Sequence, residues 1–112
     1  MMDELPNDDD GNALRQLALD GSDISRSMLI DCAVSVPNKD KGMAFAATVA
    51  KIGFKTDVHF SHGSKRWTCY CTCTMIPSYN AMIDTQAILK EAGRPFDAKP
   101  DGWGSFGNAP EA

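Results

Sequence analysis

The segment from Lys65 to Met75 alternates between two sets of side chains. Successive side chains of a β-strand point to opposite faces, so this period of two predicts a strand with one face toward a core. The apolar set is Trp67, Cys69, Cys71, Cys73 and Met75, and the other set is Thr68, Tyr70, Thr72 and Thr74. The chain must therefore place helices against one face of a sheet to bury that apolar set.

Hydrophobic periodicity and turn residues predict the other elements. They are a helix from Asn12 to Asp20, a strand from Met28 to Val36, a helix from Asn38 or Asp40 up to Gly53, a strand from Phe54 to Phe60, a helix from Ser78 to Gly93, and an extended piece from Phe96 to Phe106. After the first helix the order is β-α-β-β-α-β, which predicts an α+β, ferredoxin-like sandwich with an extra N-terminal helix. Such a sandwich leaves one sheet face open.

The turn between the expected strands Phe54 to Phe60 and Lys65 to Met75 predicts their pairing register. A two-residue turn at His62 and Gly63, or a four-residue turn from Ser61 to Ser64, gives the same register, with Val58 opposite Trp67 and Thr56 opposite Cys69. In this register His59 lies on the face away from the cysteines, so the histidine and the thiols are not expected to meet.

The 112 residues suffice for one domain. We expect an acidic flexible N-terminus over residues 1–11, a single ferredoxin-like domain over 12–106, and a flexible tail over 107–112. The net charge of -4 excludes a general cationic field for nucleic acid or anionic lipid. No apolar run is long enough for a membrane span and the first residues are acidic, so the sequence predicts a cytoplasmic protein.

Three cysteines at a spacing of two have a core interpretation and a chemical one. Buried free cysteine behaves as a small hydrophobe, which also suits Cys32 on the first strand, and the C-x-C-x-C spacing is not that of structural zinc sites. We favour the core interpretation, with no metal and no cofactor. A thiolate metal or redox protein using Cys69, Cys71 and Cys73 remains the alternative.

Enzyme and nucleic-acid functions find little support in the sequence. No Ser/His/acid order, phosphate-binding loop, zinc-protease motif or paired-carboxylate motif occurs, so no catalytic residue is assigned. Among the outward positions of the expected strands at 28–36 and 65–75, Tyr70 is the one aromatic residue. A single ring is not a stacking platform for RNA. A binding module for a protein partner is the remaining class.

Three glycine-containing motifs resemble those of a known family. Leu17 to Asp23 at the end of the first helix, Gly53-Phe54 after the second, and Asp101-Gly102-Trp103-Gly104 near the C-terminus resemble the regulator of ribonuclease E activity B family. The resemblance runs from about Asn12 to Phe106. It implies a ferredoxin-like fold and a small protein that inhibits ribonuclease E by binding it, or an associated protein, without chemistry of its own. A ferredoxin-like module for another protein partner stays open.

The motif residues have structural and functional interpretations. The structural set is Asp20, Gly21, Ser22, Asp23, Gly53, Gly102 and Gly104, expected as helix ends and turns, with Gly104 allowing a close backbone approach. The tight turn at Asp101-Gly102-Trp103-Gly104 either delivers Trp103 onto the core or presents it to a partner. The candidate partner-binding residues are Asp8, Asp9, Asp10, Tyr70, Asp101 and Trp103.

Overall fold

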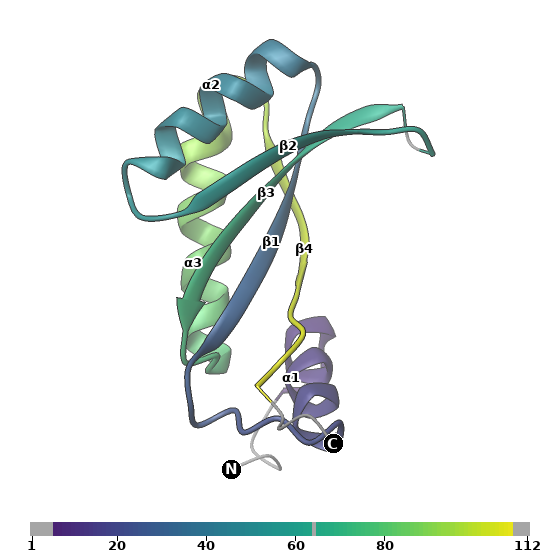
Figure 1. Cartoon of the computed structure of the whole chain (residues 1–112), viewed down its shortest axis with the longest axis vertical. Helices are drawn as coiled ribbons and strands as arrows, with labels where there is room; N and C mark the ends of the chain where they lie inside the picture. The colour runs from purple at the N-terminus through teal and green to yellow at the C-terminus, as the bar shows by residue number, and fades with distance from the viewer. Residues whose placement is uncertain (1–5, 64, 109–112) are drawn as a thin grey trace.

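The computed structural model describes residues 6–63 and 65–108. Its elements are α1 (Asp9–Leu19), β1 (Met28–Val36), α2 (Lys39–Ala50), β2 (Lys55–Ser61), β3 (Arg66–Met75), α3 (Tyr79–Gly93), the short 3-10 helix η2 (Arg94–Phe96) and β4 (Lys99–Gly104) (Figure 1). From β1 onward the helices α2 and α3 and the four strands follow the expected β-α-β-β-α-β order.

The strands form one antiparallel sheet in the order β2-β3-β1-β4. Figure 1 shows α2 and α3 against the same face of this sheet and α1 beside the far end of β4. The predicted α+β class is confirmed. Pairing of β1 with both β3 and β4 makes β1 a central strand, which explains why its alternate residues are completely buried.

The core lies between the sheet and the helices α2 and α3. Alternate residues of β1 and β3 supply its sheet side, and Phe45, Val49, Met82 and Leu89 supply its helix side, all without exposed surface. Cys32, Cys69 and Cys71 are buried among them and Cys73 is partly buried. The predicted faces of both strands are confirmed. The helix caps are as expected for the second and third helices, since Asn38 and Ser78 accept hydrogen bonds from Lys41 N–H and Ala81 N–H.

The predicted hairpin register is wrong by two residues. Val58 pairs with Cys69 and Phe60 with Trp67, and the loop between Ser61 and Arg66 lies further along the chain than expected. A shift of two preserves the face of every side chain, because the side-chain period of a strand is two. His59 therefore does lie on the face away from the cysteines, packed against Tyr70 with ring centroids 5.9 Å apart.

The N-terminal helix begins three residues earlier than predicted, at Asp9 instead of Asn12. Asp8, expected as part of a flexible arm, is its N-cap and accepts a hydrogen bond from the Gly11 N–H at 2.8 Å. Asp9 and Asp10 form the first turn, where negative charge is favoured by the helix dipole. The expected flexible residues 1–5 lie outside the described part of the chain.

The segment after β4 is fixed to the loop between α1 and β1. Asn108 accepts a hydrogen bond from the Asp23 N–H at 2.8 Å and its side-chain amide donates to the Asp23 and Ser27 carbonyls. A Cβ at Gly107 would lie 2.0 Å from the Ser22 hydroxyl, so glycine permits this approach. Residues 107 and 108, expected in a flexible tail, thus make specific contacts, and residues 109–112 lie outside the described chain.

Candidate protein-binding face

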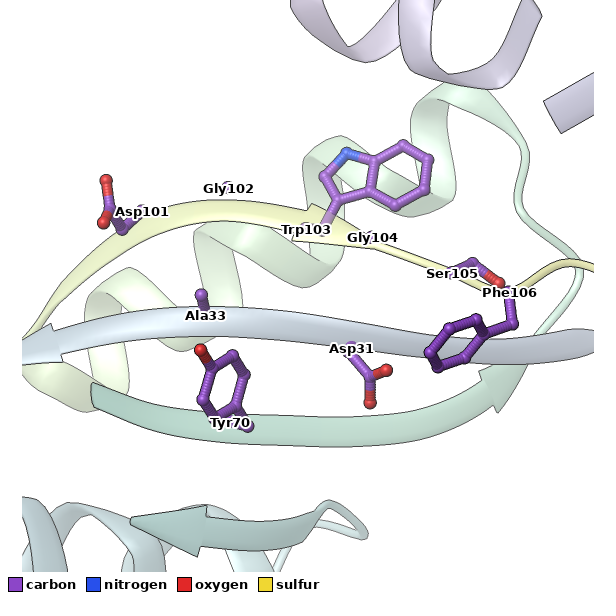
Figure 2. A pocket seen from close by; sticks show the side chains of 9 residues that line it. All are labelled: Asp31, Ala33, Tyr70, Asp101, Gly102, Trp103, Gly104, Ser105 and Phe106. Carbon is purple, nitrogen blue, oxygen red and sulfur yellow. The ribbon is translucent and has the colours of Figure 1, made fainter. Parts of the chain in front are cut away.

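The sheet face opposite α2 and α3 carries a shallow groove of about 390 Å³. Figure 2 shows its lining, which comes from β1, β3, β4 and the residues that follow β4: Asp31, Ala33, Tyr70, Asp101, Gly102, Trp103, Gly104, Ser105 and Phe106. Three of the predicted partner-binding residues, Tyr70, Asp101 and Trp103, meet here. The groove is therefore the place where the sequence and the geometry agree best on a binding site.

Tyr70 is the main aromatic side chain on this open face. Its side chain is 43% exposed, and its neighbours on β1 and β3 are the small or polar residues of the outward set. Asp31 accepts a hydrogen bond from the Thr72 hydroxyl, which orients its carboxylate. An exposed ring beside an oriented carboxylate suits a protein contact, because tyrosine buries apolar area and still offers a hydroxyl for hydrogen bonding.

Trp103 lines the groove but its indole points away from Tyr70 and toward α1 (Figure 2). The ring is partly buried against the core, and its Nε1–H donates to the Asp10 carboxylate at 2.8 Å. The same oxygen of Asp10 accepts from the Gln86 side chain at 3.1 Å. Trp103 thus connects β4, α1 and α3. Of the two interpretations of this residue, packing onto the core describes most of its contacts.

The acidic residues of α1 divide by role. Asp10 holds Trp103 and Gln86, and Asp8 accepts a hydrogen bond from the Tyr79 hydroxyl as well as capping the helix. Asp9 is exposed, and its side chain makes no hydrogen bond or ion pair with the described residues. Of the three carboxylates at the start of α1 that were predicted to meet a partner, Asp9 is the one without a structural contact of its own.

Stability against acid should carry a contribution from Asp8. Hydrogen bonds from Tyr79 and from the Gly11 N–H lower the pKa of its carboxyl below the usual 3.8. Because the folded-state pKa is depressed, this contribution is complete above about pH 4 and is lost as the pH falls through the lowered value. Urea unfolding midpoints measured from about pH 5 to pH 2 will show the fall. In Tyr79→Phe the fall should be smaller, and an unchanged slope would contradict this role of the hydrogen bond.

The glycine motifs have local explanations. Gly21, Gly53 and Gly102 have φ values of 100°, 109° and 103°, the left-handed region that side chains disfavour. The expected tight turn at Asp101–Gly104 is wrong, because these residues belong to β4. The pairing of β4 with β1 shifts register between Cys32 and Val34 of β1. The close approach expected at Gly104 is also wrong, since an added Cβ there meets no atom within 4 Å.

The buried thiols are arranged as packing groups. Cys69 and Cys71 have their sulfurs 3.9 Å apart, and this contact lowers the pKa of Cys69 while it and burial raise the pKa of Cys71. Burial raises the pKa of Cys32 to about 12. Within residues 6–63 and 65–108 no group of three or more His, Cys, Asp or Glu side chains is placed to hold a metal ion.

These surroundings predict slow thiol chemistry. The thiolate is the reactive form, and Cys32, Cys69 and Cys71 are buried. Thiol titration of the native protein should label Cys73 at most, and denaturant should release all four cysteines. Elemental analysis of protein purified without chelator serves as the companion measurement. Rapid native labelling of Cys69 and Cys71, or stoichiometric zinc, would restore the metal or redox alternative.

Sequence reasoning missed two contributors to the groove. Phe106 is fully exposed beside β1, and Asp31 provides a carboxylate near it (Figure 2). Asp31 was recognisable as an outward residue of its strand, but only the pairing of β1 with β4 brings it to the groove. Phe106 had no periodic signal, because it follows the last strand.

The fold and the groove define a small α+β domain with a shallow groove on its open sheet face. A family model described as regulator of ribonuclease activity B matches residues 7–105. The chain therefore belongs to the regulator of ribonuclease activity B family, as the glycine motifs indicated. No curated protein matches the sequence closely enough to show a relationship. Among the described residues no helix is long and apolar enough to cross a membrane.

Proposed function

We propose that this chain binds ribonuclease E, or a protein associated with it, through the open face around Tyr70 and so lowers RNA cleavage. The observation that carries the proposal is the groove of Tyr70, Asp31, Asp101 and Phe106 on an open sheet face, in a chain of a ribonuclease-regulator family. The effect is expected to come from contact in the cytoplasm and not from chemistry by this chain.

The mechanism follows from the composition of the groove. Tyr70 and Phe106 offer exposed rings that lose contact with water on binding, and Asp31 and Asp101 offer carboxylates at the same site. Basic side chains of a partner would pair with these carboxylates while its apolar side chains cover the rings. Carboxylates in a polar surrounding contribute to specificity and encounter rate, and the rings contribute to lifetime.

Binding of purified components at two ionic strengths tests the proposal. Attraction between this acidic chain and a basic segment predicts that affinity falls as salt rises. Immobilised ribonuclease E and, separately, its isolated scaffold region are the two targets. Absence of binding at about 10 μM, an interaction weaker than roughly 7 kcal/mol, would retire the proposal and leave the fold and family unaffected.

Asp9 provides the variant for charge steering. Deleting residues 1–10 would also remove the cap of α1 and the Asp10 contact with Trp103, so a deletion would mix charge with structure. Asp9→Lys replaces an exposed side chain and reverses a favourable first-turn charge of α1, and it should slow association severalfold at low salt with little effect on dissociation. Asp40→Lys, the same charge change at an exposed first-turn position of α2, is the matched control.

A further inference from the structure

The far end of the hairpin formed by β2 and β3 carries a cluster of rings. Phe60 lies between His62 and Trp67, with ring centroids 5.0 Å and 5.5 Å apart and both pairs edge-to-face. Figure 1 shows this end of the hairpin projecting beyond α2, away from the rest of the sheet. Phe60 is 40% exposed, His62 is exposed, and Trp67 is partly buried at the base of the projection. The sequence periodicity predicts Phe60 and Trp67 on the core face of the sheet. Both lie on that face, but the helices do not bury them fully.

The charge at this end is opposite to that of the whole chain. The sequence contains no Asp or Glu between Asp57 and Asp84, and within that stretch Lys65 and Arg66 are the Lys and Arg residues. Lys65 is exposed and has a φ of 57°, an uncommon conformation for a lysine, in the loop beside His62. Arg66 is exposed too, and its Nε donates to the Ser35 hydroxyl at 2.8 Å. Lys65 is thus the cation next to the ring cluster, whereas Arg66 lies on the other face of the hairpin, in a pocket that Asp97 and Asp101 also line.

We infer that the hairpin end binds single-stranded RNA. An edge-to-face ring pair covers one face of one ring, which leaves faces of Phe60 and its neighbours for stacking by unpaired bases. Lys65 is exposed in the loop that follows His62, so its charge is available to a phosphate of a strand stacked on the rings. Exposed rings next to a lysine, in a stretch of sequence without Asp or Glu, are the combination that sequence-tolerant single-strand binding uses. This activity is additional to the proposed protein contact and does not depend on it.

The net negative charge of the chain does not oppose this binding at physiological salt. The acidic start of α1 lies at the opposite end of the molecule from the hairpin end (Figure 1), and the long dimension of the molecule is 41 Å. Electrostatic interactions between exposed charges are largely screened beyond about 8 Å at that ionic strength. The acidic start of α1 therefore contributes little to the potential that an RNA strand meets beside Lys65.

The test is fluorescence anisotropy of a labelled oligouridylate of about ten nucleotides titrated with the full chain, with no ribonuclease present. Dissociation constants of non-specific nucleic-acid binding are about 10⁻⁴ to 10⁻⁶ M, and we expect a value in that range at low salt. Neutralisation of about one phosphate by Lys65 gives a slope near -0.7 in log affinity against log salt, or about a 2.6-fold loss between 50 and 200 mM. Phe60→Ala should weaken binding about tenfold, since one stacked base is lost.

Charge variants separate a local effect from a global one. Lys65→Glu should weaken binding several times more than Lys51→Glu, which changes the net charge equally in the connection before β2, at the other end of that strand from the hairpin loop. Circular dichroism of each variant checks its fold. Equal binding by the parent chain and Phe60→Ala, or no binding at about 1 mM, overturns the inference. Hairpin variants that spare oligonucleotide binding but weaken ribonuclease E binding would also overturn it, and would assign the hairpin to the protein interface.

Discussion

Trp103→Ala is expected to lower the free energy of unfolding by about 3 kcal/mol, the lower end of the range for truncation of a large aromatic side chain. The ring packs against the core, and its Nε1–H holds Asp10 at the start of α1. Truncation removes both contacts and leaves a gap between β4, α1 and α3. Urea unfolding followed by far-ultraviolet circular dichroism measures the change.

Trp103→Phe separates the ring from its hydrogen bond. It keeps most of the apolar contact and loses the donor to Asp10, so it should cost about 1 kcal/mol. A Trp103→Ala protein that unfolds at the same denaturant midpoint as the parent would contradict the packing role. Trp103 would then be assigned, like Tyr70, to partner binding.

Tyr70→Ala is expected to weaken binding of ribonuclease E about thirtyfold or more, the effect of losing roughly 2 kcal/mol at an aromatic anchor. Tyr70 is on the open face and 43% exposed, so the unfolding midpoint should change little. Binding of purified components to parent and variant measures the effect. Ile88→Ala, which truncates an exposed apolar side chain on α3, is the matched control and should bind as the parent does. Equal losses for the two variants would show that the open face is not the binding site.

The periodic parts of the fold are predictable from the sequence. In β1 and β3 the alternation of residues such as Val34 and Cys69 with their outward neighbours fixes which face is buried, because a one-residue error would expose the whole apolar set. The helix starts at Asn38 and Ser78 are predictable because their side chains cap the first turn locally.

The register of the hairpin and the limits of α1 are not predictable in the same way. A two-residue shift buries the same side chains, so the pattern cannot distinguish Val58 opposite Trp67 from Val58 opposite Cys69. The start of α1 depends on partners distant in the sequence, such as Tyr79 for Asp8 and Trp103 for Asp10. A run of carboxylates resembles a solvated terminus until those partners are in place.

The candidate site was predictable in its parts but not in its assembly. Tyr70 is an outward residue of its strand, and Asp101 belongs to a recognisable glycine motif. Their meeting with Phe106 depends on the strand order, which places β4 next to β1. Asp10 was predicted to bind a partner, but Trp103 points toward α1 and donates a hydrogen bond to it (Figure 2). This contact, too, depends on the strand order.

The most direct measurement of the account is cleavage of a defined RNA by purified ribonuclease E titrated with this chain. The account predicts that cleavage falls with increasing chain and reaches a plateau near the concentration that saturates binding, and that RNA incubated with the chain alone stays intact. Tyr70→Ala should shift the titration to about thirtyfold higher concentration. Cleavage that continues unchanged when the enzyme is saturated with the chain would contradict the central claim.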